Sequence, residues 1–360
     1  MSASAGMLMG LVGVNLAPTP AGNALAINGV ATPVLTGGAN WLAAEITDAH
    51  SSGPVTVTVA GRTATSPTPF TLVPSGTAVS SAGVGASPAG SALDGAGTLW
   101  VANAAGTTLT RLSLTGEYLS THYAGSAPVS VTISPGGTLW VANATATGTI
   151  TRLSSSGALL GQTTVGPYPG EVAFDASGQA WVNNAGDNTV TRLSSSGVVL
   201  STHNVGVPPS HAVAMAIDPS GALWVVEPTF NRLVKLASDG SVAGTYNTGS
   251  NPSDVAIDGA GAIWVSCAGA HVVQKLPPGG GAAVGYSTGA GSAPNSLAFD
   301  HQGNLWVCCE GTDSVVKLSP GGALLGTYTP GGNPSGIAFD LFRSANVSLS
   351  TTNTVVRLAL

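Results

Sequence analysis

Residues 94–103 read DGAGTLWVAN, and variants of this stretch occur six times along the chain. The tryptophans of the six copies stand 40 to 43 residues apart: Trp100, Trp140, Trp181, Trp224, Trp264 and Trp306. Six residues before the tryptophan stand Asp94, Ser134, Asp175, Asp218, Asp258 and Asp300. A seventh copy aligns without a gap when Asp340 takes the Asp position and Asn346 the Trp position. Seven units of about 41 residues therefore fill residues 88–360.

Each unit alternates short apolar runs with turn residues. The runs are rich in Val, Ile, Leu, Thr and Trp, and Gly and Pro fall between them. This pattern predicts four strands per unit and no helix of useful length. Four strands in a repeat of about 40 residues are typical of a β-propeller blade. The expected fold is all-β, with a seven-bladed β-propeller.

The end of the chain predicts how the propeller closes. The seventh unit stops at VVRLAL, its third strand, while TAVSSAGVGASP (77–88) aligns with the fourth-strand segment of the other units. An unpaired sheet edge invites association with another chain. We therefore expect residues 77–84 to supply the outer strand of the last blade, and residues 77–360 to form the propeller.

The few charged residues repeat with the units. Six of the 16 acids occupy the Asp position, and seven of the 10 bases occupy one place on the third strand: Arg111, Arg152, Arg192, Lys235, Lys275, Lys317 and Arg357. The first strand runs down to the Asp and the third runs down to the base. The two should meet at one face of the blade, as an ion pair or with the base stacked on the Trp.

Residues 1–72 lack the repeat and read as short alternating strands broken by Gly, Pro and Asn, which predicts a small β-sandwich. The stretches GVNLAPTPAGNALAINGVA and SSGPVTVTVAGRTATSPTPFTL make this segment resemble an IPT/TIG domain, an immunoglobulin-like module. That family begins with a Pro-rich strand for which there is no room before Met7. We expect this first strand to be missing, so that another segment supplies it.

Composition narrows the partners and the location. The net charge is −6, charged residues make up 7%, and no basic run occurs, which argues against nucleic acid. The apolar start GMLMGLVGVNLA is too short and Gly-rich for membrane insertion and lacks the basic region of a signal peptide. The composition favours an extracellular, cell-surface or virion protein, with a protein or glycan partner or self-assembly.

The unit pattern Pro-x-x-(V/I)-A-(F/I)-D-x-x-G-x-(L/I)-W-V resembles NHL and virginiamycin B lyase-like propellers over all seven units. In the lyases this resemblance implies a metal-assisted ring-opening elimination at a C–O bond, with His and Glu at the mouth of the central channel. Their acidic residue three positions after the Trp is matched here by Glu227, whereas Asn103, Asn143 and Asn184 stand in other units.

Candidate site residues are those expected at the channel mouth. Four residues before the Asp position stand Gly90, Ser130, Glu171, Ala214, Asp254, Ser296 and Gly336, and His211 lies close by. Glu171, Glu227 and Asp254, from blades three to five, are expected to converge on a hard cation, calcium or magnesium. The competing interpretation is that they are solvated loop carboxylates, with His211 a surface residue.

The sequence leaves three functions open. The first is a non-enzymatic binding or structural module at a cell or virion surface, with the channel mouth as its binding face and no catalytic residue. The second is a metal-dependent lyase or lactonase-type propeller enzyme. The third is a subunit of a filament or shell that assembles through the incomplete Ig-like domain.

Overall fold

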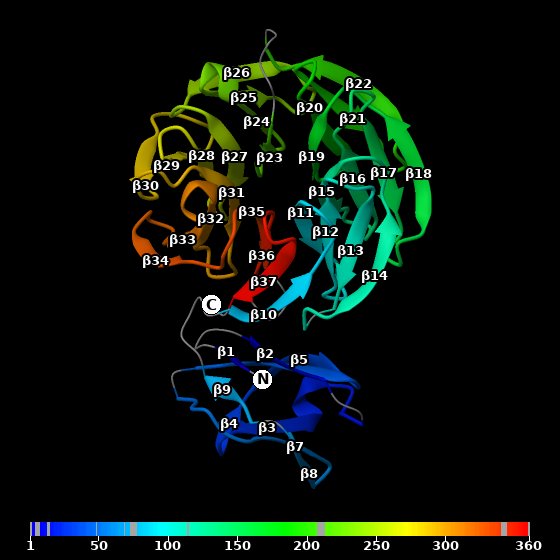
Figure 1. The fold of residues 1–360 in the computed structure, drawn as a ribbon, viewed down its shortest axis with the longest axis vertical. Helices are drawn as coiled ribbons and strands as arrows, with labels where there is room; N and C mark the ends of the chain where they lie inside the picture. Colours follow the sequence, from blue (N-terminus) through cyan, green and yellow to red (C-terminus); the bar gives the residue numbers. More distant parts are fainter. Residues whose placement is uncertain are drawn as a thin grey trace. The chain divides into compact units, whose positions relative to one another are not determined.

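The computed structural model describes residues 2–3, 8–12, 15–47, 49–67, 69–72, 78–113, 115–206, 213–339 and 344–358. Its contacts divide the chain into two compact units, one with Met1–Ser81 and the other with Ala82–Ala338 as the main segment. Strands dominate both units, as the sequence predicts (Figure 1). None of the helices in the described residues has the length and apolar character that a membrane crossing requires.

The N-terminal unit is built from short strands. They are β1 (Ser2–Ala3), β2 (Leu8–Val12), β3 (Asn23–Ile27), β4 (Val30–Thr32), β5 (Val34–Gly38), β6 (Trp41–Glu45), β7 (Val55–Val59), β8 (Arg62–Thr65) and β9 (Thr71–Leu72), with the 3-10 turn η1 (Pro20–Gly22). The sheet orders are β2-β6-β5 and β4-β3-β7-β8. Buried side chains from both sheets, among them Met9, Ile27, Ala44 and Val55, form one hydrophobic cluster.

A short strand precedes Met7 in this unit. The two-residue strand β1 pairs in parallel with β9, through Ser2 with Thr71 and Ala3 with Leu72. The absence of the Pro-rich first strand of the resembling family stays a prediction.

The repeated units fold as seven four-stranded sheets, the blades of the propeller (Figure 1). Blades 1 to 3 are β11 (Pro88–Leu93), β12 (Leu99–Asn103), β13 (Thr108–Leu112) and β14 (Tyr118–Tyr123); β15 (Pro128–Ile133), β16 (Leu139–Asn143), β17 (Thr149–Leu153) and β18 (Leu159–Thr164); and β19 (Pro169–Phe174), β20 (Ala180–Asn184), β21 (Thr189–Leu193) and β22 (Val199–Asn204). Blades 4 and 5 are β23 (Met215–Ile217), β24 (Leu223–Glu227), β25 (Arg232–Leu236) and β26 (Val242–Asn247), and β27 (Pro252–Ile257), β28 (Ile263–Cys267), β29 (Val272–Leu276) and β30 (Val284–Ser287). Blade 6 is β31 (Pro294–Phe299), β32 (Leu305–Cys309), β33 (Ser314–Leu318) and β34 (Leu324–Tyr328), and the 3-10 turns η2 (Pro228–Phe230) and η3 (Glu310–Thr312) follow β24 and β32.

The seventh sheet combines the start and the end of the repeat region. Its order is β10 (Ala78–Gly83), β37 (Thr354–Leu358), β36 (Ala345–Leu349) and β35 (Pro334–Phe339). The backbone N–H of Val84 donates to the carbonyl of Asn353 at 2.9 Å, and the N–H of Ser87 donates to its Oδ1 at 2.8 Å. The outer strand of the last blade is therefore β10, which lies within the predicted segment 77–84.

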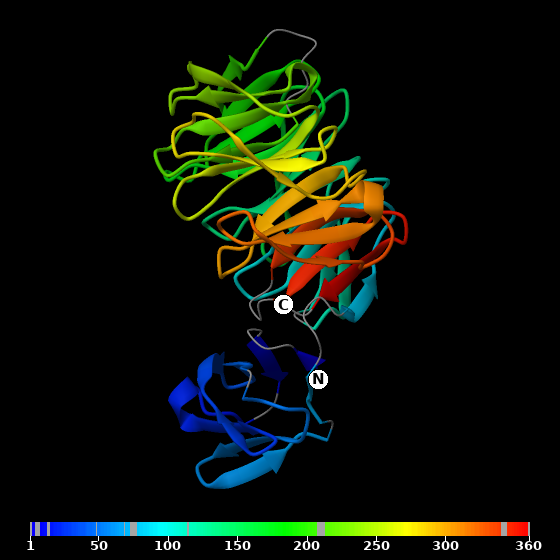
Figure 2. The same ribbon diagram turned by 90° about the vertical axis from the view of Figure 1, so that its left-hand side faces the viewer.

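The repeated sequence pattern follows from the blade structure. The second strand of every blade is buried at all five positions, because it lies between strands of its own sheet and between neighbouring blades. Figure 2 shows the neighbouring yellow and orange blades side by side. In blades 1 to 6 the turn between the first two strands holds a glycine with positive φ, such as Gly97 at +79°, where L side chains are strained.

Asp, Trp and base meet in most blades. In blade 6 the indole N–H of Trp306 donates to Asp300 Oδ2 at 3.0 Å, and Lys317 Nζ lies 3.3 Å from the same oxygen. Lys317 Nζ also lies 4.9 Å from the centre of the Trp306 ring, so the base makes both expected contacts. Ion pairs of this kind are present in blades 3 to 6. The seventh Asp position, Asp340, lies outside the described residues, and Asn346 at the seventh Trp position is buried.

Candidate functional site

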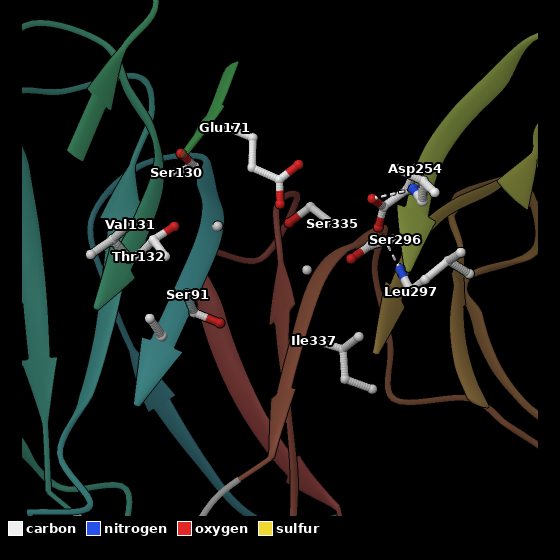
Figure 3. Close-up of a pocket in the computed structure, with 14 residues that line it drawn as sticks. Ser91, Ser130, Val131, Thr132, Glu171, Asp254, Ser296, Leu297, Ser335 and Ile337 are labelled. Atoms are coloured by element: carbon white, nitrogen blue, oxygen red, sulfur yellow. Dashed lines mark hydrogen bonds between the residues drawn. The ribbon is translucent and has the colours of Figure 1, made fainter. Parts of the chain in front are cut away.

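The innermost strands of six blades surround a cavity of about 310 Å³ (Figure 3). Its lining residues are Gly90, Ser91, Ala92, Ser130, Val131, Thr132, Glu171, Asp254, Val255, Ser296, Leu297, Ser335, Gly336 and Ile337. Six of the seven predicted ring positions are among them, and Ala214 is not. Among the described lining residues the acids are Glu171 and Asp254, and none is Lys, Arg or His. We call this space the axial cavity.

The side chain of Glu171, on β19, is held in place by a hydrogen bond from the next blade. Its Oε2 accepts a hydrogen bond from the backbone N–H of Met215 at 2.8 Å. Its own backbone N–H donates to Asn183 Oδ1 at 2.5 Å. The other carboxyl oxygen, Oε1, has no hydrogen-bond partner among the described residues, and Figure 3 shows the carboxyl group pointing into the space between the inner strands. Glu171 therefore presents one free oxygen to the axial cavity.

Asp254 occupies the equivalent place on β27 but has both oxygens engaged. Oδ2 accepts from the backbone N–H of Leu297 in the next blade at 2.7 Å, and Oδ1 accepts from the N–H of Val255 at 2.7 Å (Figure 3). Two N–H donors favour the ionised form of a carboxyl group. Asp254 is thus a fixed acceptor, in contrast to Glu171.

The axial cavity shifts the proton affinity of both groups. Burial, together with the nearby charge of Asp254, raises the pKa of Glu171 to about 8. Burial raises the pKa of Asp254 to about 7, against the opposing effect of its two backbone hydrogen bonds. Both side chains are half-buried, and no cation compensates their charge among the described lining residues. Near neutral pH the two carboxyl groups can therefore both hold and release a proton, as acid–base catalysis requires.

Glu227 does not join the other two carboxylates, which corrects the expectation of a three-carboxylate metal site. It is fully buried at the end of β24, forms an ion pair with Arg232 through Oε2, and accepts from Asn188 Nδ2 at 3.2 Å through Oε1. The equivalent place in blade 3 holds Asn184, which donates to Thr189. The Glu227–Arg232 pair therefore replaces an Asn–Thr hydrogen bond within the blade, and the hydrogen bond from Asn188 links Glu227 of blade 4 to blade 3.

The donor set does not fit the divalent metal that the lyase resemblance implies. No group of three or more His, Cys, Asp or Glu side chains in the described residues is placed to hold a metal ion. Asp254 already accepts two backbone N–H groups, and Glu227 is neutralised by Arg232. His211 lies outside the described residues. Calcium and magnesium prefer about six or more oxygen ligands, and the two axial carboxyls supply one uncommitted oxygen.

Asn183 helps to hold Glu171, although the repeat pattern does not single it out. Asn183 is fully buried on β20, and its Oδ1 accepts the backbone N–H of Glu171. The equivalent positions in blades 1, 2 and 4 are Ala102, Ala142 and Val226. A polar residue at a place that is apolar in the neighbouring units is the signal that could have identified it.

Comparison with known proteins gives the same fold. The chain has a TM-score of 0.71 with virginiamycin B lyase from Staphylococcus aureus at 16% identity, covering 78% of this chain and 98% of that one. A catalytically inactive variant of that enzyme with quinupristin also has a TM-score of 0.71 at 16% identity, with 78% and 99% covered. The Cps50 (Swd1) β-propeller domain of Myceliophteria thermophila has a TM-score of 0.66 at 11% identity, with 80% and 100% covered. None of the curated proteins matches the chain.

A family match covers most of the propeller. Residues 78–318 match the virginiamycin B lyase family, from the closing strand β10 to the third strand of blade 6. This segment includes Glu171, Asp254 and Glu227. The chain belongs to the virginiamycin B lyase family.

Proposed function

We propose that this chain is a lyase-type propeller enzyme that works in the axial cavity. The observation that carries the proposal is the pair of carboxyl groups on the cavity wall, Glu171 and Asp254, whose pKa values lie near neutrality. The family match supports an enzyme over the non-enzymatic alternative. A cavity of about 310 Å³ admits a small molecule or one residue of a larger one.

Glu171 is the group that would move the proton. In a C–O elimination a base removes a proton from carbon, the C–H electrons form the new double bond, and the C–O electrons leave with oxygen. The free Oε1 of Glu171 can accept that proton in the fraction of molecules in which Glu171 is ionised, a fraction that grows as pH rises toward its pKa of about 8. In that ionised form the raised pKa makes the carboxylate a stronger base than an ordinary one. Asn183 and the N–H of Met215 would hold the carboxyl group in place.

The test is to incubate the purified protein with quinupristin and with small cyclic esters and to follow the products by mass spectrometry. Elimination opens a ring with no change in mass, whereas a lactonase adds one water. We expect Glu171→Gln to lower the rate at least about 100-fold, the typical contribution of general acid–base catalysis. Glu117→Gln, a change at an exposed carboxylate, is the matched control. Full activity of Glu171→Gln would refute the role of Glu171.

The second candidate is a binding propeller without chemistry. Glu171 and Asp254 each accept a backbone N–H from the following blade, so both also have a structural role that needs no reaction. Saturable ligand binding with no product for any ester would favour this candidate. In that case we propose a partner at a cell or virion surface, as the low charge suggests.

For the N-terminal unit we propose an IPT/TIG-like module that mediates self-assembly. The support is that its two sheets share one hydrophobic cluster, and that β8, at the edge of its sheet, is exposed at all four positions. An exposed edge strand can pair with another chain. Light scattering after size exclusion tests this proposal, and a full-length chain that stays monomeric at all concentrations would contradict it.

A further inference from the structure

The wall of the axial cavity offers acceptors that lack donors. Glu171 Oε1 has no partner among the described residues, and the hydroxyl oxygens of Ser91 and Ser130 are buried and form no hydrogen bond there. Buried polar groups are normally satisfied, and an orphan in a cavity indicates a missing partner. The two hydroxyl oxygens are closed off from the cavity, so Glu171 Oε1 is the acceptor that a ligand with an N–H donor would reach.

The charge of the axial cavity also favours a ligand that donates hydrogen bonds. In blades 3 to 6 each repeated aspartate has a Lys or Arg within 3.7 Å, whereas the axial pair has no cation in the described lining. An anionic ligand would be repelled there, and a cation would supply the charge that the pair lacks. The cation should also donate a hydrogen bond, since the uncommitted atom, Glu171 Oε1, is an acceptor.

We propose that the axial cavity binds a primary ammonium group at the end of a short alkyl chain. This inference rests on the proposed location of the ligand site and holds whether the site catalyses a reaction or only binds. One N–H would donate to Glu171 Oε1, and the charge would face Asp254. The cavity of about 310 Å³ leaves room for a short alkyl chain beside the ammonium group.

Binding should release a proton. Burial and the charge of Asp254 raise the pKa of Glu171 to about 8, so the free protein holds a proton there at pH 7. A bound cation favours the ionised carboxylate and expels that proton. Among the described residues, the buried thiol of Cys308 also interacts with Asp254, and burial raises its pKa well above the usual value, so it stays neutral.

The experiment is calorimetric titration of the full chain with n-butylammonium at pH 7 in two buffers of different ionisation enthalpy. We expect one site per chain and release of close to one proton, and Glu171→Gln should weaken binding at least about tenfold. Glu117→Gln should bind as the parent does. Nα-acetyl-lysine amide as a second titrant distinguishes a lysine side chain from a free amine as the source of the group.

Two further probes can overturn the proposal. Tetramethylammonium carries the same charge without N–H donors, and n-butanol has a similar shape without charge. Equal binding of either, or no binding of n-butylammonium to folded parent protein, would refute ammonium recognition. Binding without turnover in the ester assay would refute only the lyase proposal, so the two failures are distinguishable.

Discussion

The propeller has two sets of carboxylates with opposite surroundings. Those at the repeated Asp position lie beside a tryptophan N–H and a base, as Asp300 does beside Trp306 and Lys317. Burial alone would raise the pKa of Asp300, but hydrogen bonds from Trp306 and Asn304 and the charge of Lys317 hold that pKa below the usual value. Glu171 and Asp254 have no such cation in the described lining, and their pKa values are raised. The repeated carboxylate stabilises the blade, and the carboxylate that does not repeat is the one available for a ligand.

The largest effect should come from removing the tryptophan of the stabilising set. Trp306 is fully buried, and Trp306→Ala should lower the free energy of unfolding by about 3–5 kcal/mol, because it leaves a cavity between blades. Urea unfolding followed by circular dichroism measures this. A loss below about 1 kcal/mol, typical of a surface site, would contradict the packing role.

Neutralising one carboxylate from each set sharpens the comparison. Asp300→Asn should lower the free energy of unfolding at pH 7 by about 2 kcal/mol, because a buried charged acceptor is lost. The isosteric Glu171→Gln should not destabilise, because the carboxyl it replaces is mostly protonated at that pH. If both variants lose equal stability in urea, the two sets are not distinct.

The axial pair should also set the pH dependence of stability. In the unfolded chain the two carboxyls titrate at 4.5 and 3.8, and in the folded chain at about 8 and about 7. The folded state therefore binds more protons between these values, and its stability is fully present below about pH 4 and is lost as pH rises through 7 to 8. Unfolding measured at pH 5.5 and 8.5 should show a fall that Glu171→Gln reduces by at least about 1 kcal/mol. An unchanged slope would show that the folded-state pKa of Glu171 is ordinary.

The smallest expected effect concerns blade 2. It carries Ser134 at the Asp position, and the indole nitrogen of Trp140 is buried there without a hydrogen-bond partner. Ser134→Asp should supply the acceptor and place a charge near Arg152, which stacks on Trp140, and should stabilise by about 0.5–1 kcal/mol. Thermal unfolding of the variant and of the parent protein measures this difference. A destabilised variant would show that blade 2 has no room for the carboxylate.

The repeat explains how much of this fold could be read from sequence. Gly97 in its turn, Trp100 in its buried strand and Arg111 over the indole recur at fixed spacing, so each blade predicts the next. Glu227 could not be placed in this way, because its partner Arg232 stands where blades 1 to 3 have Thr and the side chain turns toward the blade. The enclosure of Glu171 depends on backbone groups of the neighbouring blade, which no spacing within one unit reveals.

The seventh sheet has a consequence for synthesis on the ribosome. Strand β10 ends at Gly83 and its partner β37 begins at Thr354, so about 270 residues are made after the first strand before the second exists. At typical elongation rates this takes on the order of tens of seconds, during which β10 has no sheet to join. The propeller can thus become a closed ring only after β37 has been made, and until then the emerging blades depend on their own hairpins and on any holdase that covers the open edge.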